Sequence, residues 1–199
     1  EAPRRPATPA PHPHADHAAG AAPLPAAPGA AVLATAPVAA VLDGTAVERS
    51  GLEQAKAAGL YPAEVSFTPL RAHVVEDGHT LRVGDTELTL LLTEGHADGH
   101  LSALVREADG TLSACTGDLV FARGRAALLD DSEETDLTRW QASVRRLAAA
   151  QPDRLLPGHG TPVLRRASSH LAMALQALDA GAEPPRLIDS DLRPRRDHP

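Results

Sequence analysis

The pattern of hydrophobic and polar residues divides the chain into three parts. Residues 31–35 (AVLAT) are a short apolar run that predicts a strand. Residues 37–60 have a helical composition with a break near Gly44 and a stop at Gly59, so we expect two helices there. A β-rich part follows, and after it comes a part in which two helices flank a strand.

The central, β-rich part covers residues 64–121 and consists of short apolar runs separated by turn signals. Asp77-Gly78 predicts a hairpin between two short strands, and Gly84-Asp85 predicts another turn. The continuous apolar run at residues 87–93 is typical of a buried strand. A further hairpin is expected across Asp109-Gly110.

The C-terminal part starts with an amphipathic helix predicted over residues 133–149, with Thr135 or Asp136 as its N-cap. Its apolar positions fall on one stripe, which predicts a buried face: Leu137, Trp140, Val144 and Leu147. Residues 154–156 predict a strand, and residues 163–180 predict a second amphipathic helix. The order of elements indicates a mixed α/β domain with helices packed on sheets.

The two ends of the chain differ in composition from the part between them. Residues 1–11 contain four prolines and are expected to form an extended lead-in. Residues 182–199 are expected to form a loose tail. The total of 199 residues suits a single domain, which we place at residues 12–181.

The net charge of −7 at pH 7 narrows the class of partner. Nucleic acids and anionic membrane surfaces both require a basic patch on the protein, so neither is expected as the main partner. No apolar run approaches the ~20 residues that a membrane span needs.

Cys115 is the only cysteine in the chain. A single cysteine excludes a disulfide framework and a cysteine-based zinc site, and it fits a reducing compartment. We therefore expect a cytoplasmic protein, in which Cys115 is a small buried apolar residue.

The densest group of chemically active residues lies in the segment PHPHADHAAG, residues 11–20. It contains His12, His14, Asp16 and His17. In an extended chain, residues two apart share a face, so His12, His14 and Asp16 are expected to point the same way. A turn at residues 16–17 would bring His17 to the same place.

Three further candidates follow predicted strands. His96 comes after the run 87–93, Asp118 comes after a strand at 111–115, and His159 comes after the strand at 154–156. Strand ends followed by glycine-containing loops can present ligands to one cleft. Nitrogen and oxygen donors of this kind suit zinc, and imidazole also accepts iron or manganese. The seven residues together predict a metal site.

These residues stand in motifs that resemble the metallo-β-lactamase superfamily. The motifs are HPHADH at residues 12–17, GH at 95–96, TGD at 116–118 and PGHG at 157–160. The resemblance runs from His12 to about Pro162 and implies an αββα sandwich with a dinuclear metal site on one edge. The family places several strands before the first motif, so we expect the N-terminal strands of the sandwich to be missing here.

The resemblance also implies a role for each ligand. The first metal would be bound by His12, His14 and His96. The second would be bound by Asp16, His17 and His159, and Asp118 would bridge the two.

The chemistry expected of such a site is hydrolysis of an ester, thioester, lactone or similar bond in a small-molecule substrate. Two zinc ions hold a water between them and lower its pKa, which produces a hydroxide for attack at neutral pH. Asp16 is the expected catalytic residue, since it would orient the hydroxide and pass a proton to the leaving group.

Two other interpretations of this metal site also fit the sequence. A persulfide-dioxygenase-like enzyme would use a single iron on a subset of the same ligands. A degenerate remnant would bind metal without catalysis.

Other features narrow the comparison within the superfamily. Quorum-signal lactonases use a tyrosine after the GD motif, whereas the only tyrosine here, Tyr61, precedes it. Thioesterases of the hydroxyacylglutathione type share all seven ligands and hold glutathione with a basic C-terminal region. Arg165 and Arg166 are available for that role.

The remaining histidines and acids are expected to be structural or solvated. His100 is expected to form a structural hydrogen bond, with a supporting role behind His96 as the alternative. The others are expected at the surface, together with an acidic run at Asp130, Asp131, Glu133 and Glu134: His73, His79, His170 and His198.

Overall fold

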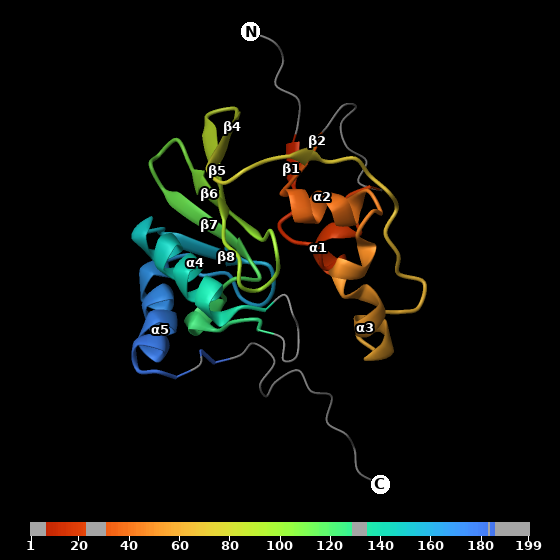
Figure 1. Cartoon of the computed structure of the whole chain (residues 1–199). Coiled ribbons are helices and arrows are strands. Elements are labelled where there is room, and N and C mark those ends of the chain that lie inside the picture. The colour runs from red at the N-terminus through yellow and green to blue at the C-terminus, as the bar shows by residue number, and fades with distance from the viewer. Residues whose placement is uncertain (1–6, 23–30, 129–134, 183, 186–199) are drawn as a thin grey trace.

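The computed structural model describes residues 7–22, 31–128, 135–182 and 184–185. The acidic run at residues 130–134, His198 and most of the C-terminal tail lie outside these ranges. Within them the chain forms two β-sheets covered by helices on both outer sides (Figure 1). The fold is therefore the expected α/β sandwich.

The larger sheet has five strands in the order β4-β5-β6-β7-β8. Neighbouring strands are antiparallel except for the parallel pair β7 and β8. Both the turn at Gly84-Asp85 and the hairpin across Asp109-Gly110 are confirmed by these pairings. The strands are β4 (His79–Val83), β5 (Thr86–Leu92), β6 (Leu101–Arg106), β7 (Leu112–Gly117) and β8 (Arg154–Pro157).

The smaller sheet has three parallel strands in the order β1-β2-β3. They are β1 (Ala7–Pro9), β2 (Ala31–Ala34) and β3 (His73–Val74). The expected hairpin at Asp77-Gly78 is wrong, because β3 pairs with β2 whereas β4 pairs with β5 of the other sheet. The turn carries the chain between the sheets, and Val75 is buried between them beside Leu90.

Three short helices accompany the smaller sheet on its outer side (Figure 1). They are α1 (Ala15–Ala18), α2 (Ala36–Leu42) and α3 (Leu52–Ala57), with a 3-10 turn at Val47–Ser50. The predicted break near Gly44 is confirmed, since Gly44 has a φ of 88° just after α2. Ala18, Ala34 and Val38 form the apolar contact between these helices and the sheet.

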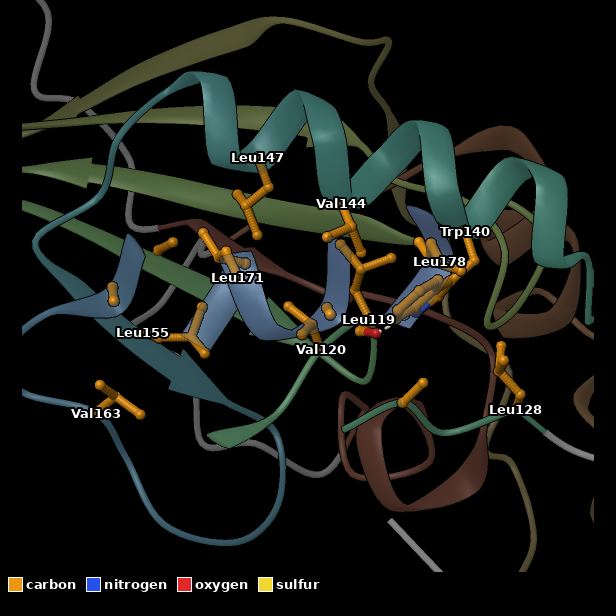
Figure 2. Packing of buried hydrophobic residues seen from close by; sticks show 14 residues of the cluster. Leu119, Val120, Leu128, Trp140, Val144, Leu147, Leu155, Val163, Leu171 and Leu178 are labelled. Atoms are coloured by element: carbon orange, nitrogen blue, oxygen red, sulfur yellow. Dashed lines mark hydrogen bonds between the residues drawn. The ribbon is translucent and has the colours of Figure 1, made fainter. Parts of the chain in front are cut away.

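Helices α4 (Leu137–Ala149) and α5 (Ala167–Asp179) cover the larger sheet (Figure 1). The carboxylate of Asp136 accepts a hydrogen bond from the backbone N–H of Arg139, so Asp136 is the N-cap of α4. Figure 2 shows Trp140, Val144 and Leu147 on the inner side of α4, facing α5 and β8. The predicted buried stripe is therefore confirmed, with Leu137 partly buried at its end.

Helix α5 begins later than the predicted residue 163. Val163 exchanges two backbone hydrogen bonds with Leu155 of β8, at 2.8 and 2.9 Å, and so belongs to an extended segment. Arg166 has a φ of 59°, and the helical backbone starts only after it. Pairing with the sheet thus takes precedence over the amphipathic pattern of residues 163–166.

None of the helices in the described ranges is long and apolar enough to cross a membrane.

Candidate metal centre

The seven predicted ligands lie together at one edge of the two sheets. The segment after β1 supplies two histidines, α1 supplies two residues, and the loops after β5, β7 and β8 supply one each. The side chains form two groups, and within each group one ligand atom per residue lies within 4.8 Å of the others. The groups are His12, His14 and His96, and then Asp16, His17, Asp118 and His159.

The local backbone of the HPHADH motif differs from the extended chain that its spacing suggests. His14 is extended, with φ −62° and ψ 146°, but α1 begins at the next residue. The helical turn places Asp16 and His17 in the second group, although the His17 ring stays beside that of His12, with centroids 4.1 Å apart. The expectation that Asp16 shares a face with His12 and His14 is therefore wrong. Burial of Ala15 and Ala18 accounts for the helical turn, because it packs the small residues of α1 inward.

His12 is buried and has no hydrogen-bond partner in the protein. Its side chain has no exposed surface, and neither ring nitrogen makes a hydrogen bond. Burial, followed by the neighbouring histidines, lowers the pKa of His12 well below its usual value, so the ring is neutral. Buried polar atoms without partners are rare in folded proteins and call for an explanation such as a bound ion.

His96 is fixed in the orientation that a metal ligand requires. Its Nδ1 donates a hydrogen bond to the carbonyl oxygen of Ala127 at 2.6 Å. The lone pair is thereby left on Nε2, which lies 3.1 Å from Nδ1 of His14. Burial lowers the pKa of His96 to about 4, which keeps this lone pair free.

The carboxylate of Asp118 faces both groups. Its Oδ1 lies 3.3 Å from His17 Nε2, and its Oδ2 lies 3.5 Å from His159 Nε2 and 3.8 Å from His96 Nε2. Oδ1 is buried and makes no hydrogen bond. This arrangement suits an oxygen donor placed between two cations.

The second group attracts positive charge. Burial alone would lower the pKa of His17, but the carboxylates of Asp118 and Asp16, each with an oxygen 3.3 Å from Nε2, raise that pKa to about 9. In the absence of metal, a proton on His17 therefore balances the two carboxylates. A divalent cation held by the same atoms would supply that balance in its place.

Asp16 has a partner that the sequence did not reveal. Tyr61 donates a hydrogen bond from its hydroxyl to Asp16 Oδ1 at 2.6 Å, while Asp16 Oδ2 lies 2.8 Å from His159 Nε2. Burial acts to raise the pKa of Asp16, but the hydrogen bonds with His17 and Tyr61 outweigh it and hold the pKa well below its usual value. The carboxylate is therefore ionised.

His100 supports the site from behind, as predicted for a structural hydrogen-bonding residue. Its Nε2 accepts the backbone N–H of Asp118 at 3.2 Å, so the proton lies on Nδ1, which is 3.0 Å from Thr93 Oγ1. Full burial lowers the pKa of His100 to about 3. The ring also stacks on His12, with centroids 5.2 Å apart. The predicted structural hydrogen bond of His100 is therefore confirmed, and its partners are Thr93 and Asp118 instead of His96.

The glycine of the last motif is required by space. A Cβ at Gly158 would lie 2.5 Å from Asp118 Oδ1 and 2.6 Å from the His17 ring. Any side chain there would push into the second group, so the PGHG loop can approach the carboxylates only with glycine at this position.

The donor set and its environment fit metal ions. The described ligands offer only imidazole nitrogens and carboxylate oxygens, which suit zinc, iron or manganese. His12 and Asp118, one from each ligand group, have buried polar atoms without a hydrogen-bond partner, which a bound ion would satisfy.

The remaining predicted residues lie elsewhere. His73 and His79 are exposed, as expected. His170 is not simply solvated, because its Nδ1 accepts the backbone N–H of Arg123 at 2.8 Å. Cys115 is half-buried in β7, where burial raises its pKa.

Comparisons with known proteins agree with this geometry. The model of the metallo-beta-lactamase superfamily matches residues 12–159. A probable metallo-hydrolase of Bacillus subtilis, YqgX, is 34% identical over 120 residues, which cover 57% of this chain and 53% of that protein. The chain thus matches about half the length of this curated relative.

Solved structures share the fold. A metallo-β-lactamase of Cronobacter sakazakii with a HARLDQ motif has a TM-score of 0.62 at 22% identity, covering 88% of this chain and 71% of that one. TTHA1623, solved in a di-iron-bound form, has a TM-score of 0.54 at 28% identity, covering 76% of this chain and 68% of that one. The matched motifs and the shared fold show that this chain belongs to the metallo-β-lactamase superfamily.

Proposed function

We propose that the chain is a metal-dependent hydrolase with two zinc ions, acting on an ester, thioester, lactone or similar bond of a small-molecule substrate. Its single cysteine further supports a cytoplasmic location. The superfamily and the metallo-hydrolase relative support the general class, and the site supports the finer statement.

One observation carries the proposal. Seven nitrogen and oxygen donors, from five separate segments of the chain, converge in two adjacent groups, and the atoms of His12 that face this cluster have no partner in the protein. Such a cluster of imidazoles and ionised carboxylates, much of it buried, is costly to assemble unless a cation binds it. Two groups with a carboxylate between them favour two ions over one.

The metal ions and the side chains of the site would have different roles in such a reaction. When bound, a pair of zinc ions provides a hydroxide at neutral pH and stabilises negative charge on the reacting oxygen. Asp16 is the residue placed to direct the proton, because its carboxylate is partly exposed, with a side-chain exposure of 31%, and ionised. Tyr61 holds that carboxylate in one orientation through Oδ1.

The experiment is a hydrolysis panel of ester, thioester and lactone probes with the zinc-loaded chain. We expect His14→Ala and Asp118→Ala to lower kcat/KM by at least about 100-fold, since metal ligands act as a unit. His79→Ala is the matched control, because His79 is an exposed histidine on β4 and its loss should leave activity unchanged.

The proposal fails if none of the probes is hydrolysed by a zinc-loaded, folded chain, or if His14→Ala and His79→Ala behave alike. Activity that requires iron in place of zinc would favour the single-iron oxygenase alternative.

A further inference from the structure

A cavity of about 500 Å³ adjoins the second ligand group. Its walls are the turn from Phe121 to Arg125, the loop from His159 to Val163, and His170 of α5. His159 belongs both to this cavity and to the ligand group, so a molecule bound in the cavity reaches the candidate metal centre.

Two arginines line this cavity without a carboxylate partner. Arg123 is exposed and Arg125 is half-buried. Within the described ranges neither forms an ion pair, and none of the residues that line the cavity is acidic. Five other arginines pair with an aspartate or glutamate: Arg49, Arg139, Arg145, Arg146 and Arg154. The other arginines of the described ranges also lack such a pair, but none of them lines this cavity. In a chain with a net charge of −7, two unpaired guanidinium groups in one cavity favour an external anion.

The backbone that presents these arginines is held in a defined shape. Arg123 has a φ of 66°, a left-handed conformation that costs a non-glycine residue roughly 1–2 kcal/mol. Its N–H donates to His170 Nδ1 at 2.8 Å, and the N–H of Phe121 donates to the carbonyl of Arg125 at 2.9 Å. A strained backbone conformation is kept only where the surrounding contacts hold it in place, and it is often found at binding sites.

Packing against α5 fixes the same turn from the other side. A Cβ at Gly124 would overlap the backbone of Ala174 in α5. Because the turn and the helix fit so closely, the guanidinium groups start from a rigid base, which lowers the entropic cost of binding a ligand.

We propose that Arg123 and Arg125 form an anion-binding subsite, so that the substrate carries a carboxylate or phosphate group on the side of the molecule away from the bond that is cleaved. Guanidinium groups bind the paired oxygens of either anion with charge-assisted hydrogen bonds. The inference rests on the proposed hydrolase function and specifies its substrate class.

Arg165 and Arg166, which the sequence suggested as residues that could hold glutathione, lie outside this cavity. Arg165 and Arg166 line a different cavity with Asp109, Gly110 and Asp153. Residues 109 and 110 stand before β7, whereas Asp118 follows its far end, and six strand residues span about 20 Å. Arg165 and Arg166 are therefore at the wrong end of the sheet and serve as controls.

The first test compares three p-nitrophenyl esters with the zinc-loaded chain: the neutral butyrate, the glutarate monoester and the 4-phosphonobutyrate. We expect kcat/KM for at least one anionic ester to exceed that for the butyrate by about tenfold or more, and the larger ratio to distinguish carboxylate from phosphate. Arg123→Gln and Arg125→Gln should each lower that ratio by about tenfold through KM. Arg165→Gln and Arg166→Gln should leave it unchanged.

A second test does not depend on hydrolysis. Glutarate and 3-phosphonopropionate are titrated into the metal-free chain, and binding is followed by NMR chemical shifts. We expect the affinity for the preferred anion to fall about tenfold in Arg123→Gln and in Arg125→Gln, and to stay the same in Arg165→Gln.

The outcomes separate the two proposals. Equal kcat/KM for all three esters, or equal anion affinities in the wild type and the Arg125→Gln variant, overturns the subsite while the hydrolase function stands. Anion binding that depends on Arg123 and Arg125, in a chain that hydrolyses none of the esters, supports the subsite and counts against the proposed function.

Discussion

Asp16 shares its two carboxylate oxygens between different partners. Oδ2 lies beside His159 and His17, within the second ligand group, whereas Oδ1 accepts the hydroxyl of Tyr61. Because Oδ1 is already held by a hydrogen bond, the carboxylate loses less conformational entropy when Oδ2 binds a cation. Tyr61 is therefore a positioning residue for the second group only.

This role predicts a selective effect of Tyr61→Phe. The change removes one hydroxyl and keeps the ring, so we expect the affinity for the second metal ion to fall by about 10- to 100-fold, with binding to the three-histidine group unchanged. Titration of zinc against a competing chelator resolves the two steps.

Leu60→Ala provides the control for this variant. Leu60 is 72% exposed and adjacent to Tyr61, so its change tests whether altering the segment alone is enough. The role of Tyr61 would be contradicted if Tyr61→Phe weakened the binding of both zinc ions equally. It would also be contradicted if Leu60→Ala weakened the second ion as much as Tyr61→Phe does.

The metal ligands could be predicted from the sequence, whereas two other features of the site could not. All seven ligands stood in recognisable motifs, and the structure brings them together. Tyr61 had no motif, because a contact between residues 45 positions apart leaves no local pattern. The division of Asp16 from His12 was also hidden, since it depends on one turn of helix at Ala15.

At the scale of elements, Asp77 connects three segments. Its carboxylate accepts the backbone N–H of Leu92 at the end of β5 and the guanidinium of Arg146 in α4, at 2.8 and 2.7 Å. The hydrogen bond with Arg146 lowers the pKa of Asp77, with a smaller contribution from the Leu92 N–H. The residue thus fixes the turn between the sheets against the end of β5, directly before the loop that carries His96.

We expect Asp77→Ala to lower the free energy of unfolding by about 1 kcal/mol at pH 7, because it removes two hydrogen bonds that are partly exposed to solvent. The folded pKa of Asp77 is lowered, so its contribution is present above the unfolded value of about 4 and is lost as the pH falls through the folded value.

Urea unfolding at pH 7 and pH 3 measures this effect. The difference between wild type and Asp77→Ala should shrink at pH 3. Asp85→Asn, at an exposed turn, should match the wild type at both values. A difference that grows on acidification would show that the ion pair is not its source.

Elements with strong local patterns were predicted closely, and those set by pairing between segments were not. Helix α4 and the β6–β7 hairpin follow from an apolar stripe and a turn signal. The strand pairing of β3 does not, because a two-residue strand has no periodicity and its partner β2 lies in a distant part of the chain. Similarly, the start of α5 is set by the pairing of Val163 with β8.

At the scale of the whole molecule, the two sheets act as a frame for the candidate centre. Leu33 and Leu90 pack between the sheets, and Ala10 and Pro11 make backbone hydrogen bonds to Leu33 of β2 and Leu101 of β6, at 2.8 and 2.7 Å. The HPHADH motif is thus tied to both sheets just before His12. Ligands from either sheet therefore keep a fixed separation.

The central claim is that this frame holds two metal ions, and the number of zinc ions per chain tests it most directly. We expect elemental analysis of the zinc-loaded, folded protein to give about two ions per chain, and about one or fewer in Asp118→Ala, which removes the carboxylate between the groups. Zinc binding well below one ion per chain in the wild type, or a count that Asp118→Ala leaves at two, would contradict the account.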